Sequence, residues 1–380
     1  MSSTASSGLE RVRRALRHAP GLQFLAECAY RSPGSWLFRG ENLEWLREEA
    51  LVAQLPRAYR AFARYCTALG PNPVGAELLL RTIIRRRGGR DEDSVVAMAI
   101  HGTTVCLDLR DPRFLAIPNE IRRGLPRLLK RFLHPGDTFL DIGANHGTFS
   151  VTASRLVGAS GRVIAIEPQE RLANLVGRSL ASGEAPCAVH QVACGREPGE
   201  TELYVPEASS GAAGLHKSYS AGALHRTARV RVVRLDDLIA SESMPGKVLV
   251  KIDVEGNESN CLRGATRFLA ERRPPILIEL NPRALHAAGS SVPELVSILQ
   301  DLGYRHCLGG PDLTVQSPLT PNITDGNILA LPNDEHPHPS APPPADSGRN
   351  LESPNGGTSH PRPNRNVTAP QRNENPAGVA

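Results

Sequence analysis

The stretch Leu133-His-Pro-Gly-Asp-Thr-Phe-Leu-Asp-Ile-Gly-Ala-Asn-His-Gly-Thr-Phe-Ser150 decides the fold. It contains a short apolar strand, a turn with Gly143 and Gly147, and the start of a helix. In a doubly wound α/β sheet, a ligand binds at the carboxyl end of the first strand, where a helix N-terminus offers free N–H groups. The stretch therefore predicts a nucleotide-binding turn at residues 141–147.

The turn has the pattern Asp141-x-Gly143-x-Asn145-x-Gly147, which differs from a dinucleotide fingerprint. That fingerprint places a glycine where Asn145 stands, so that a pyrophosphate can approach the backbone. A carboxylate at position 141 suits a cationic or amino-bearing ligand instead. S-adenosylmethionine carries a sulfonium and an α-amino group and has no phosphate. The turn therefore favours this cofactor over NAD, and an NAD-dependent dehydrogenase stays the alternative enzyme class.

Glu167 follows the apolar run 162–166 and stands 20 residues after Gly147. A carboxylate at the tip of the second strand can accept hydrogen bonds from both ribose hydroxyls. The alternative is that this acid only stabilises the start of the next helix. Asp141, Gly143 and Glu167 are therefore the candidates for a phosphate-free nucleoside site.

Strand-length apolar runs alternate with helix-like segments between residues 101 and 332. The runs are 138–142, 162–166, 188–193, 248–252, 275–280 and 327–331. This alternation predicts βαβ units in a mainly parallel, doubly wound sheet. The runs 201–205 and 230–235 alternate apolar and polar residues and predict an antiparallel insertion. The small-residue segment between them, 206–228, is consistent with a substrate loop or with a plain surface loop.

Acidic residues lie at the ends of the fourth and fifth predicted strands. Asp253 and Glu255 follow one strand, and Glu279 lies near the end of the other. Asp253 and Glu255 share a face if the strand continues through them. An isolated buried carboxylate is costly, which favours a place in an open cleft. We assign Asp253, Glu255 and Glu279 to the catalytic cleft. The alternative for the acids after the fourth strand is an acid-rich helix start, which fits Glu258 best.

Proton removal from a hydroxyl acceptor requires a base. Asp253 is the first candidate, Glu279 the second, and His146 the third. Asp253, Glu255 and Glu279 could instead hold a divalent metal ion, but the expectation from the sequence is a site without metal.

In this order, the motifs resemble the FkbM family of S-adenosylmethionine-dependent methyltransferases. The matching segments are Asp141–Ser150, Glu167-Pro168, Arg234-Leu-Asp-Asp-Leu238, Lys251-Ile-Asp-Val-Glu-Gly-Asn-Glu258, Leu262-Arg-Gly-Ala265 and Ile278-Glu279. The resemblance covers about residues 100–332 and implies a class I methyltransferase-like Rossmann fold. It also implies O-methyl transfer from S-adenosylmethionine to a hydroxyl of a sugar, glycan or natural product. The cofactor-binding residues that it implies are Asp141, Gly143, Asn145, Gly147 and Glu167. A non-catalytic, cofactor-binding interaction protein is a further alternative, which the cleft acids disfavour.

The regions on either side fall outside the resemblance. Residues 1–100 have apolar residues at helical spacing, broken by prolines, and are expected to form a helical N-terminal region. Residues 333–380 are rich in proline and lack Phe, Trp, Tyr and Ile. Such a composition predicts a disordered tail, because it cannot bury enough surface to offset its ordering entropy. The predicted domains are therefore 1–100, 101–332 and 333–380.

Composition excludes several classes of protein. The chain has 380 residues, and no apolar stretch approaches the roughly 18 residues of a membrane-spanning helix. Its start lacks an apolar signal segment, and its seven scattered cysteines include no CxxC pair, so we expect a cytoplasmic protein. Residues 1–136 carry 22 basic and 13 acidic side chains. Because aromatics are not interleaved among them, we expect no nucleic-acid partner. The oligomeric state is not predicted.

Overall fold

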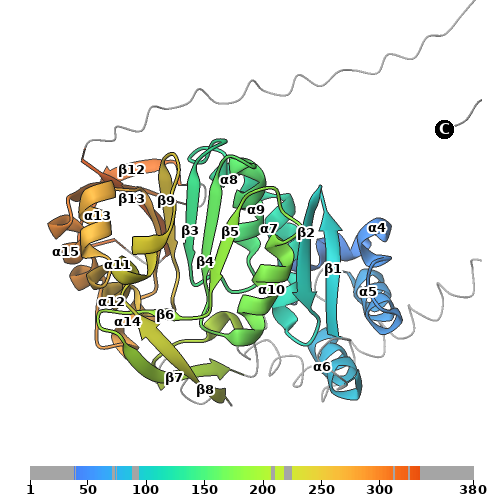
Figure 1. The fold of residues 1–380 in the computed structure, drawn as a ribbon. Helices are drawn as coiled ribbons and strands as arrows, with labels where there is room; N and C mark the ends of the chain where they lie inside the picture. The colour runs from blue at the N-terminus through green and yellow to red at the C-terminus, as the bar shows by residue number, and fades with distance from the viewer. Residues whose placement is uncertain are drawn as a thin grey trace, which may run out of the picture. The chain divides into compact units, whose positions relative to one another are not determined.

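The computed structural model describes residues 38, 40–70, 73, 75–87, 94–206, 210–217, 225–310, 313–323 and 326–333 (Figure 1). Two expectations fall outside the described residues. One is the helical character of residues 1–37, and the other is the disorder of the tail from residue 334 onward. Both stay predictions.

An eight-stranded sheet of order β12-β11-β13-β10-β9-β3-β4-β5 forms the centre of the fold. Its strands are β3 (Thr138–Ile142), β4 (Arg162–Ile166), β5 (Cys187–His190), β9 (Val248–Ile252), β10 (Ile276–Leu280), β11 (Tyr304–Gly309), β12 (Val315–Pro318) and β13 (Gly326–Pro332). The strands β5, β4, β3, β9 and β10 run parallel, whereas β13 is antiparallel to both β10 and β11. This topology confirms the predicted class I methyltransferase-like Rossmann fold.

The chain switches direction across the sheet at β3, which pairs with β4 on one side and β9 on the other. Ligands of doubly wound sheets bind at such a switch point, outside the carboxyl ends of the strands. The predicted glycine turn follows β3, and the predicted acids follow β9 or lie on β10. The topology therefore brings both predicted groups to one edge of the sheet.

Helices cover both faces of this sheet, because its central strands are buried and apolar on both sides. Phe139 packs in one hydrophobic cluster and its neighbour Leu140 in the other. The helices are α7 (Ile117–Arg122), α8 (Gly124–Leu129), α9 (Thr148–Val157), α10 (Glu170–Leu180), α11 (Leu235–Leu238), α12 (Glu258–Arg263), α13 (Thr266–Arg272), α14 (Pro282–Ala287) and α15 (Val292–Asp301). In the part of the chain that the structure describes, no helix has both the length and the apolar character needed to cross a bilayer.

A three-stranded sheet of order β6-β8-β7 follows β5. It consists of β6 (Ala193–Cys194), β7 (Gly199–Pro206) and β8 (His225–Val233), and β7 pairs with β8 in antiparallel register. The predicted antiparallel insertion is confirmed. The predicted run 188–193 was too long at its end, because β5 ends at His190 and Ala193 pairs with Val232 of β8 instead.

The N-terminal elements pack against the rest of the chain (Figure 1). They are α3 (Gly40–Leu43), η2 (Glu44–Arg47), α4 (Glu49–Val52), α5 (Arg57–Leu69), α6 (Ala76–Arg87) and the hairpin of β1 (Val95–Ile100) and β2 (Thr103–Asp108). Trp45 donates its indole N–H to the Leu115 carbonyl at 2.8 Å, and the Tyr59 hydroxyl donates to the Leu109 carbonyl at 2.9 Å. These residues share one apolar cluster with Phe139 of the central sheet. The expected helical character of residues 1–100 is wrong at its end, because Val95–Ile100 is a strand paired with β2. The division of the chain at residue 100 stays a prediction.

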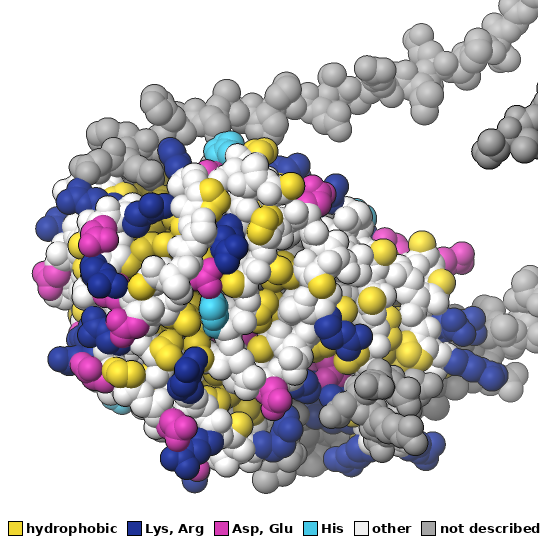
Figure 2. Space-filling view, viewed as in Figure 1, with side chains coloured by type: hydrophobic (Ala, Val, Ile, Leu, Met, Phe, Trp, Pro, Cys, Tyr) yellow, Lys and Arg dark blue, Asp and Glu magenta, His cyan; other side chains and the backbone are white. Residues whose placement is uncertain are grey.

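Charged side chains are dispersed over the face drawn in Figure 2. Lys and Arg occur there at several separate places, with Asp and Glu among them. The basic excess of the sequence therefore does not gather into one continuous patch on that face.

Candidate active site

The turn after β3 packs directly against the residues that follow β9. Gly143 and Gly147 have φ angles of +79° and +77°, and Asn145 has a φ of +52°. A Cβ atom on Gly143 would lie 1.9 Å from the carbonyl oxygen of Asp253. Glycine is therefore required at position 143 both by the backbone angle and by the close approach. Asn145 is among the non-glycine residues that adopt this region most readily.

Glu167 lies beside this turn and is buried. Its Oε2 accepts a hydrogen bond from the Asn145 N–H at 2.8 Å, and its Oε1 accepts one from the Gln169 N–H at 2.9 Å. Burial raises the pKa of Glu167 to about 7, against the opposing effect of these two backbone hydrogen bonds. Each carboxylate oxygen has two lone pairs. Glu167 therefore holds both the turn and the start of α10, and still keeps acceptor capacity for a ligand.

Asp141 is fully buried beneath the turn and is paired within the protein. Its Oδ2 accepts a hydrogen bond from the Ser150 hydroxyl at 2.6 Å, and its Oδ1 lies 3.4 Å from the Lys251 ammonium. Lys251 also donates to the Gly143 carbonyl at 2.9 Å and lies 3.3 Å from Asp253 Oδ2. Burial lowers the pKa of Lys251, but Asp253 and Asp141 more than offset this and leave it above its ordinary value.

Sequence reasoning gave Lys251 no role. The signal was present, since a lysine in the buried strand 248–252 must find a counter-charge. The structure shows that its ammonium bridges the glycine turn, Asp141 and Asp253. Lys251 therefore connects the two predicted groups of site residues.

Asp253, Glu255 and Glu279 converge at the ends of β9 and β10. One carboxylate oxygen of each lies within 4.8 Å of the others. We call these three residues the acid cluster. The strand does not continue through Asp253 and Glu255, which was the condition for the expected shared face, because β9 ends at Ile252 and Glu255 has a φ of +52°. A tight turn, not strand alternation, brings Glu255 to this edge of the sheet.

Glu258 begins α12 directly behind the acid cluster and is fully buried. Its Oε1 accepts hydrogen bonds from the Val254 and Gly256 N–H groups at 3.0 and 3.2 Å. Burial raises the pKa of Glu258 to about 7, and the charge of Asp253 contributes. Burial also raises the pKa of Glu279 to about 8, with the charges of Asp253 and Glu258 adding to it. This edge of the sheet is therefore crowded with acids.

His146 is poorly suited to the role of the base, for which it was the third candidate. Its ring Nδ1 is 2.6 Å from the Asn145 side-chain oxygen, and its Nε2 is 3.8 Å from Asp111 Oδ2. Burial lowers the pKa of His146 to about 4, with the charge of Asp111 opposing this effect. A neutral, buried imidazole with so low a pKa is a poor base at neutral pH.

Residues 210–217, the described middle of the predicted loop 206–228, contact the glycine turn. Asp111 Oδ2 accepts a hydrogen bond from the Ser210 N–H at 3.2 Å. The Ser210 carbonyl accepts from the side chains of Asn145 and Gln169, each at 3.4 Å. Sequence reasoning assigned nothing to Asp111, because only the tertiary fold brings it to Ser210. This segment lies beside the predicted cofactor residues.

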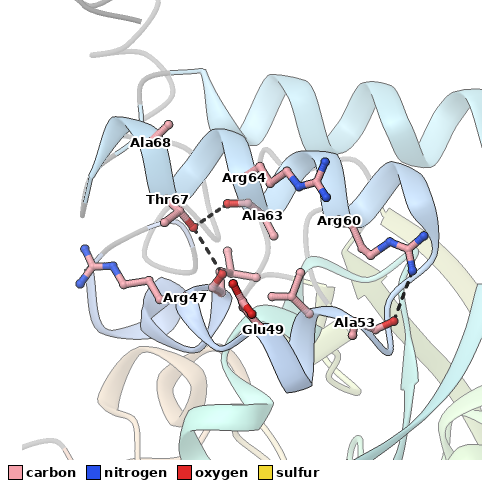
Figure 3. Close-up of a pocket in the computed structure, with 10 residues that line it drawn as sticks. Arg47, Glu49, Ala53, Arg60, Ala63, Arg64, Thr67 and Ala68 are labelled. Carbon is pink, nitrogen blue, oxygen red and sulfur yellow. Dashed lines mark hydrogen bonds between the residues drawn. The ribbon is translucent and has the colours of Figure 1, made fainter. Parts of the chain in front are cut away.

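A pocket of about 620 Å³ lies on the N-terminal helices, between α5 and the η2–α4 segment (Figure 3). Two of its polar side chains are engaged with backbone carbonyls. Thr67 donates to Ala63 at 2.8 Å, and Arg60 donates to Ala53 at 3.4 Å. The predicted site residues are absent from its lining, which consists of Leu46, Arg47, Glu49, Val52, Ala53, Arg60, Ala63, Arg64, Thr67 and Ala68. We assign no chemistry to this pocket.

Comparison with known proteins gives a family for the region that carries the site. Residues 141–306 match the family model described as the methyltransferase FkbM domain. The chain is 27% identical over 143 residues to the hexuronic acid methyltransferase AglP of Haloferax volcanii, covering 38% of this chain and 56% of that protein. It is 38% identical over 94 residues to a probable cobalt-precorrin-6B C(15)-methyltransferase (decarboxylating) of Saccharolobus solfataricus, covering 22% and 46%. The chain thus spans about half the length of these curated relatives.

The solved structures that match this chain have low sequence identity and low TM-scores. The methyltransferase FkbM of Methylobacillus flagellatus matches with a TM-score of 0.31 and 16% identity, over 73% of this chain and 72% of that one. A SAM-dependent methyltransferase of Aquifex aeolicus matches with a TM-score of 0.32 and 17% identity, over 59% and 94%.

Proposed function

We propose that this chain binds S-adenosylmethionine and methylates a hydroxyl oxygen, since its residues 141–306 match the methyltransferase FkbM domain. The acceptor class is a sugar, glycan or natural product. One observation carries the proposal. The glycine turn and the acid cluster meet at one edge of the sheet, where Gly143 packs against the Asp253 carbonyl. A cofactor on the turn would therefore place its reactive end beside the acids.

The residues of the turn fit this cofactor. Glu167 is a buried carboxylate whose oxygens each accept one backbone N–H, which leaves capacity for the two ribose hydroxyls. Gly143, Asn145 and Gly147 shape the backbone that would hold the nucleoside. Asp141 would act indirectly, since Ser150 and Lys251 already occupy its carboxylate. In this proposal it positions Lys251, and through Lys251 the turn.

S-adenosylmethionine, when bound, supplies a methyl group on a positively charged sulfur. The chain must then align the acceptor hydroxyl, exclude water and remove a proton. Alignment alone contributes about 7–11 kcal/mol in well-oriented reactions. A positioned base contributes about 10²–10⁴-fold. We propose that Asp253 accepts the proton of the acceptor hydroxyl. Its carboxylate is held by the ion pair of Oδ2 with Lys251, and it lies next to the turn. Glu279 is the second candidate.

The similarity to a hexuronic acid methyltransferase supports a sugar-like acceptor. The acceptor can be found by incubating the protein with S-adenosylmethionine carrying an isotopically labelled methyl group and an extract of the producing cell. A labelled product identified by mass spectrometry then provides the substrate for kinetics. A product labelled on carbon or nitrogen would overturn the proposal of O-methylation.

Asp253→Asn tests the assignment of the base. This change keeps the shape of the side chain and removes its charge, so turnover should fall about 10²-fold or more. The dissociation constant for S-adenosylmethionine should change less than twofold. The matched control is Asp237→Asn, an acid on α11 whose side chain is 66% exposed, and it should keep full turnover. Unchanged turnover in Asp253→Asn would remove this residue from the mechanism, and an equal loss of affinity would show that it grips the cofactor instead.

Calorimetry with each cofactor tests the alternative enzyme class. S-adenosylmethionine should bind to the full chain, and NAD should not. Tight binding of NAD alone would replace methyl transfer with hydride transfer.

A further inference from the structure

The three carboxylates of the acid cluster have the spacing of ligands around one cation. Their oxygens lie within 4.8 Å of one another. Two ligands of the same ion can be separated by at most twice the ion–oxygen distance, which is about 4.2 Å for Mg²⁺ and about 4.8 Å for Ca²⁺. The spacing of the cluster is therefore compatible with three oxygen ligands of one such ion. All three side chains are partly buried, at the carboxyl ends of β9 and β10.

A fourth acid behind the cluster points independently to a missing partner. Glu258 is 0% exposed, and its Oε1 already accepts two backbone N–H groups. Its Oε2 is buried and has no hydrogen-bond partner within the described ranges. The charges of these acids act on one another, since Asp253 affects Glu258 and both affect Glu279. Burying an acid beside three others is costly unless a proton or a cation neutralises it.

The protein's own cations at this edge are largely engaged elsewhere. Lys251 lies 3.3 Å from Asp253, but it also pairs with Asp141 and donates to the Gly143 carbonyl. Arg113, whose charge also acts near Asp253, forms an ion pair with Glu120 at 2.6 Å. The charge of Lys251 lowers the pKa of Glu279, but burial and the neighbouring acids outweigh it. Glu279 Oε2 is also buried without a hydrogen-bond partner among the described residues.

We propose that Asp253, Glu255 and Glu279 bind one hard divalent cation, such as Mg²⁺, Mn²⁺ or Ca²⁺, with Glu258 as a buried counter-charge behind it. This replaces the metal-free site expected from the sequence. The catalytic role of this cation rests on the proposed function, since the cation would hold the acceptor's hydroxyl oxygen beside the cofactor. Each carboxylate gives one oxygen to the ion, which leaves the second oxygens of the cluster to receive the hydroxyl proton. Oxygen ligands of this kind are those that Mg²⁺ and Ca²⁺ prefer.

Titration with Mn²⁺ tests the site without any acceptor. The full-length protein is first treated with EDTA and exchanged into metal-free buffer, and free Mn²⁺ is followed by its electron paramagnetic resonance signal. We expect one Mn²⁺ per chain, displaced by excess Mg²⁺ or Ca²⁺. Glu279→Gln and Asp253→Asn should each weaken Mn²⁺ binding at least tenfold, whereas Asp237→Asn should bind as the wild type does. Absence of stoichiometric binding, or binding that survives both cluster variants, would overturn the proposal.

A second measurement on the wild type keeps the test valid if a variant fails to fold. A cation that binds only the folded chain raises the melting temperature by mass action. Addition of Mg²⁺ or Ca²⁺ to metal-free wild type should therefore raise its melting temperature, and no rise with either ion at millimolar concentration would count against the site.

S-adenosylmethionine binding in EDTA separates this inference from the proposed function. Its affinity should change less than twofold without the cation, because no acid-cluster residue is among the five assigned to the cofactor. Cofactor binding without Mn²⁺ binding would defeat only the cation site. Mn²⁺ binding without cofactor binding would defeat the proposed function and leave the cation site standing.

Discussion

The glycine turn and the acid cluster lie at the same edge of the sheet, yet they differ in how their charges are satisfied. At the turn, both oxygens of Glu167 accept backbone N–H groups, and Asp141 is paired with Ser150 and Lys251. At the acid cluster, Glu279 and the neighbouring Glu258 each have a buried oxygen without a hydrogen-bond partner among the described residues. Asp141 Oδ1 also lacks a hydrogen-bond partner among the described residues, but it lies 3.4 Å from the Lys251 ammonium. The fold thus supplies a counter-charge to the buried acid of the first region, whereas the second region crowds several carboxylates together. We therefore expect damage to the turn to act on stability, and changes in the acid cluster to act on ligands.

Gly143→Ala should have the largest effect. The new Cβ would meet the Asp253 carbonyl at 1.9 Å, at a backbone angle that an alanine rarely adopts. Relief would require the turn to move away from β9. We expect a loss of about 5 kcal/mol or more in the free energy of unfolding, enough to unfold many domains. Urea denaturation followed by circular dichroism measures it.

Gly177→Ala is the matched control for that prediction. Gly177 lies within α10, and a Cβ there meets nothing within 4 Å. Alanine favours a helix interior over glycine by about 0.5–1 kcal/mol, so this variant should be slightly more stable than the wild type. If both alanine variants behaved alike, the close packing of the turn on β9 would not be the cause.

Lys251→Met should have the next largest effect, because Lys251 belongs to both regions. Its loss leaves Asp141 buried without its counter-charge, and removal of one partner of a buried pair costs about 3–5 kcal/mol. The double variant Asp141→Asn with Lys251→Met removes both charges and should recover part of that loss. Thermal and urea unfolding of the two proteins give the comparison. A double variant less stable than Lys251→Met would refute the pairing as the origin of the effect.

The sequence predicted the central strands well because their signal is local. The predicted runs 138–142, 162–166 and 248–252 coincide with β3, β4 and β9. A strand buried on both faces is a continuous apolar run, and turn residues delimit it on each side. The strands β11 and β12 were not predicted, because no such run distinguishes them from the loops around them. The hairpin of β1 and β2 was also missed, although Val95–Ile100 is an apolar run, because that run adjoins the helical pattern of the N-terminal region.

The sequence predicted the site residues that lie at the ends of strands, but not the contacts that hold them in place. Glycines, acids and strand order sufficed to bring Glu167, Asp253 and Glu279 to one edge. The contacts that order them come from elsewhere in the chain. Lys251 reaches back to the turn, and Asp111 binds Ser210 across 99 positions of sequence. Pairings over such distances depend on tertiary packing, which the periodicity of one sequence does not contain.

The pH dependence of cofactor affinity tests whether the ionised carboxylate of Glu167 binds the ribose hydroxyls. Burial raises the pKa of Glu167 to about 7, so the folded protein holds a proton there at pH 6 and has largely lost it at pH 8. Ribose hydroxyls need the ionised carboxylate as acceptor, hence affinity should rise as pH passes upward through about 7. From one-tenth to nine-tenths ionised, we expect about a tenfold gain in affinity between pH 6 and pH 8. Calorimetric titration of S-adenosylmethionine at several pH values measures it.

Glu167→Gln provides the control for that pH series. The glutamine keeps the length of the side chain and cannot titrate, so the pH dependence due to this residue should vanish. Any dependence that the variant keeps belongs to the ligand or to other groups and is subtracted. An identical tenfold rise in both proteins would show that Glu167 is not the group responsible.

Glu279→Gln should cause the smallest change in the free energy of unfolding. It should stabilise the protein, whereas Gly143→Ala and Lys251→Met destabilise it. In EDTA, burial and the charges of Asp253 and Glu258 disfavour the ionised carboxylate. At pH 7 the folded wild type must either protonate this carboxyl or bury its charge, and glutamine avoids that cost at almost constant volume. The free energy of unfolding should therefore rise by about 1 kcal/mol, which is about 1–2 °C in melting temperature for a chain of this size. With saturating Mg²⁺ the order should reverse, because only the wild type retains all three carboxylates for the ion. Melting curves of both proteins, with EDTA and with Mg²⁺, form the complete test. If glutamine destabilised the protein in EDTA, Glu279 would already be satisfied by the fold, and the difference between the two regions would disappear.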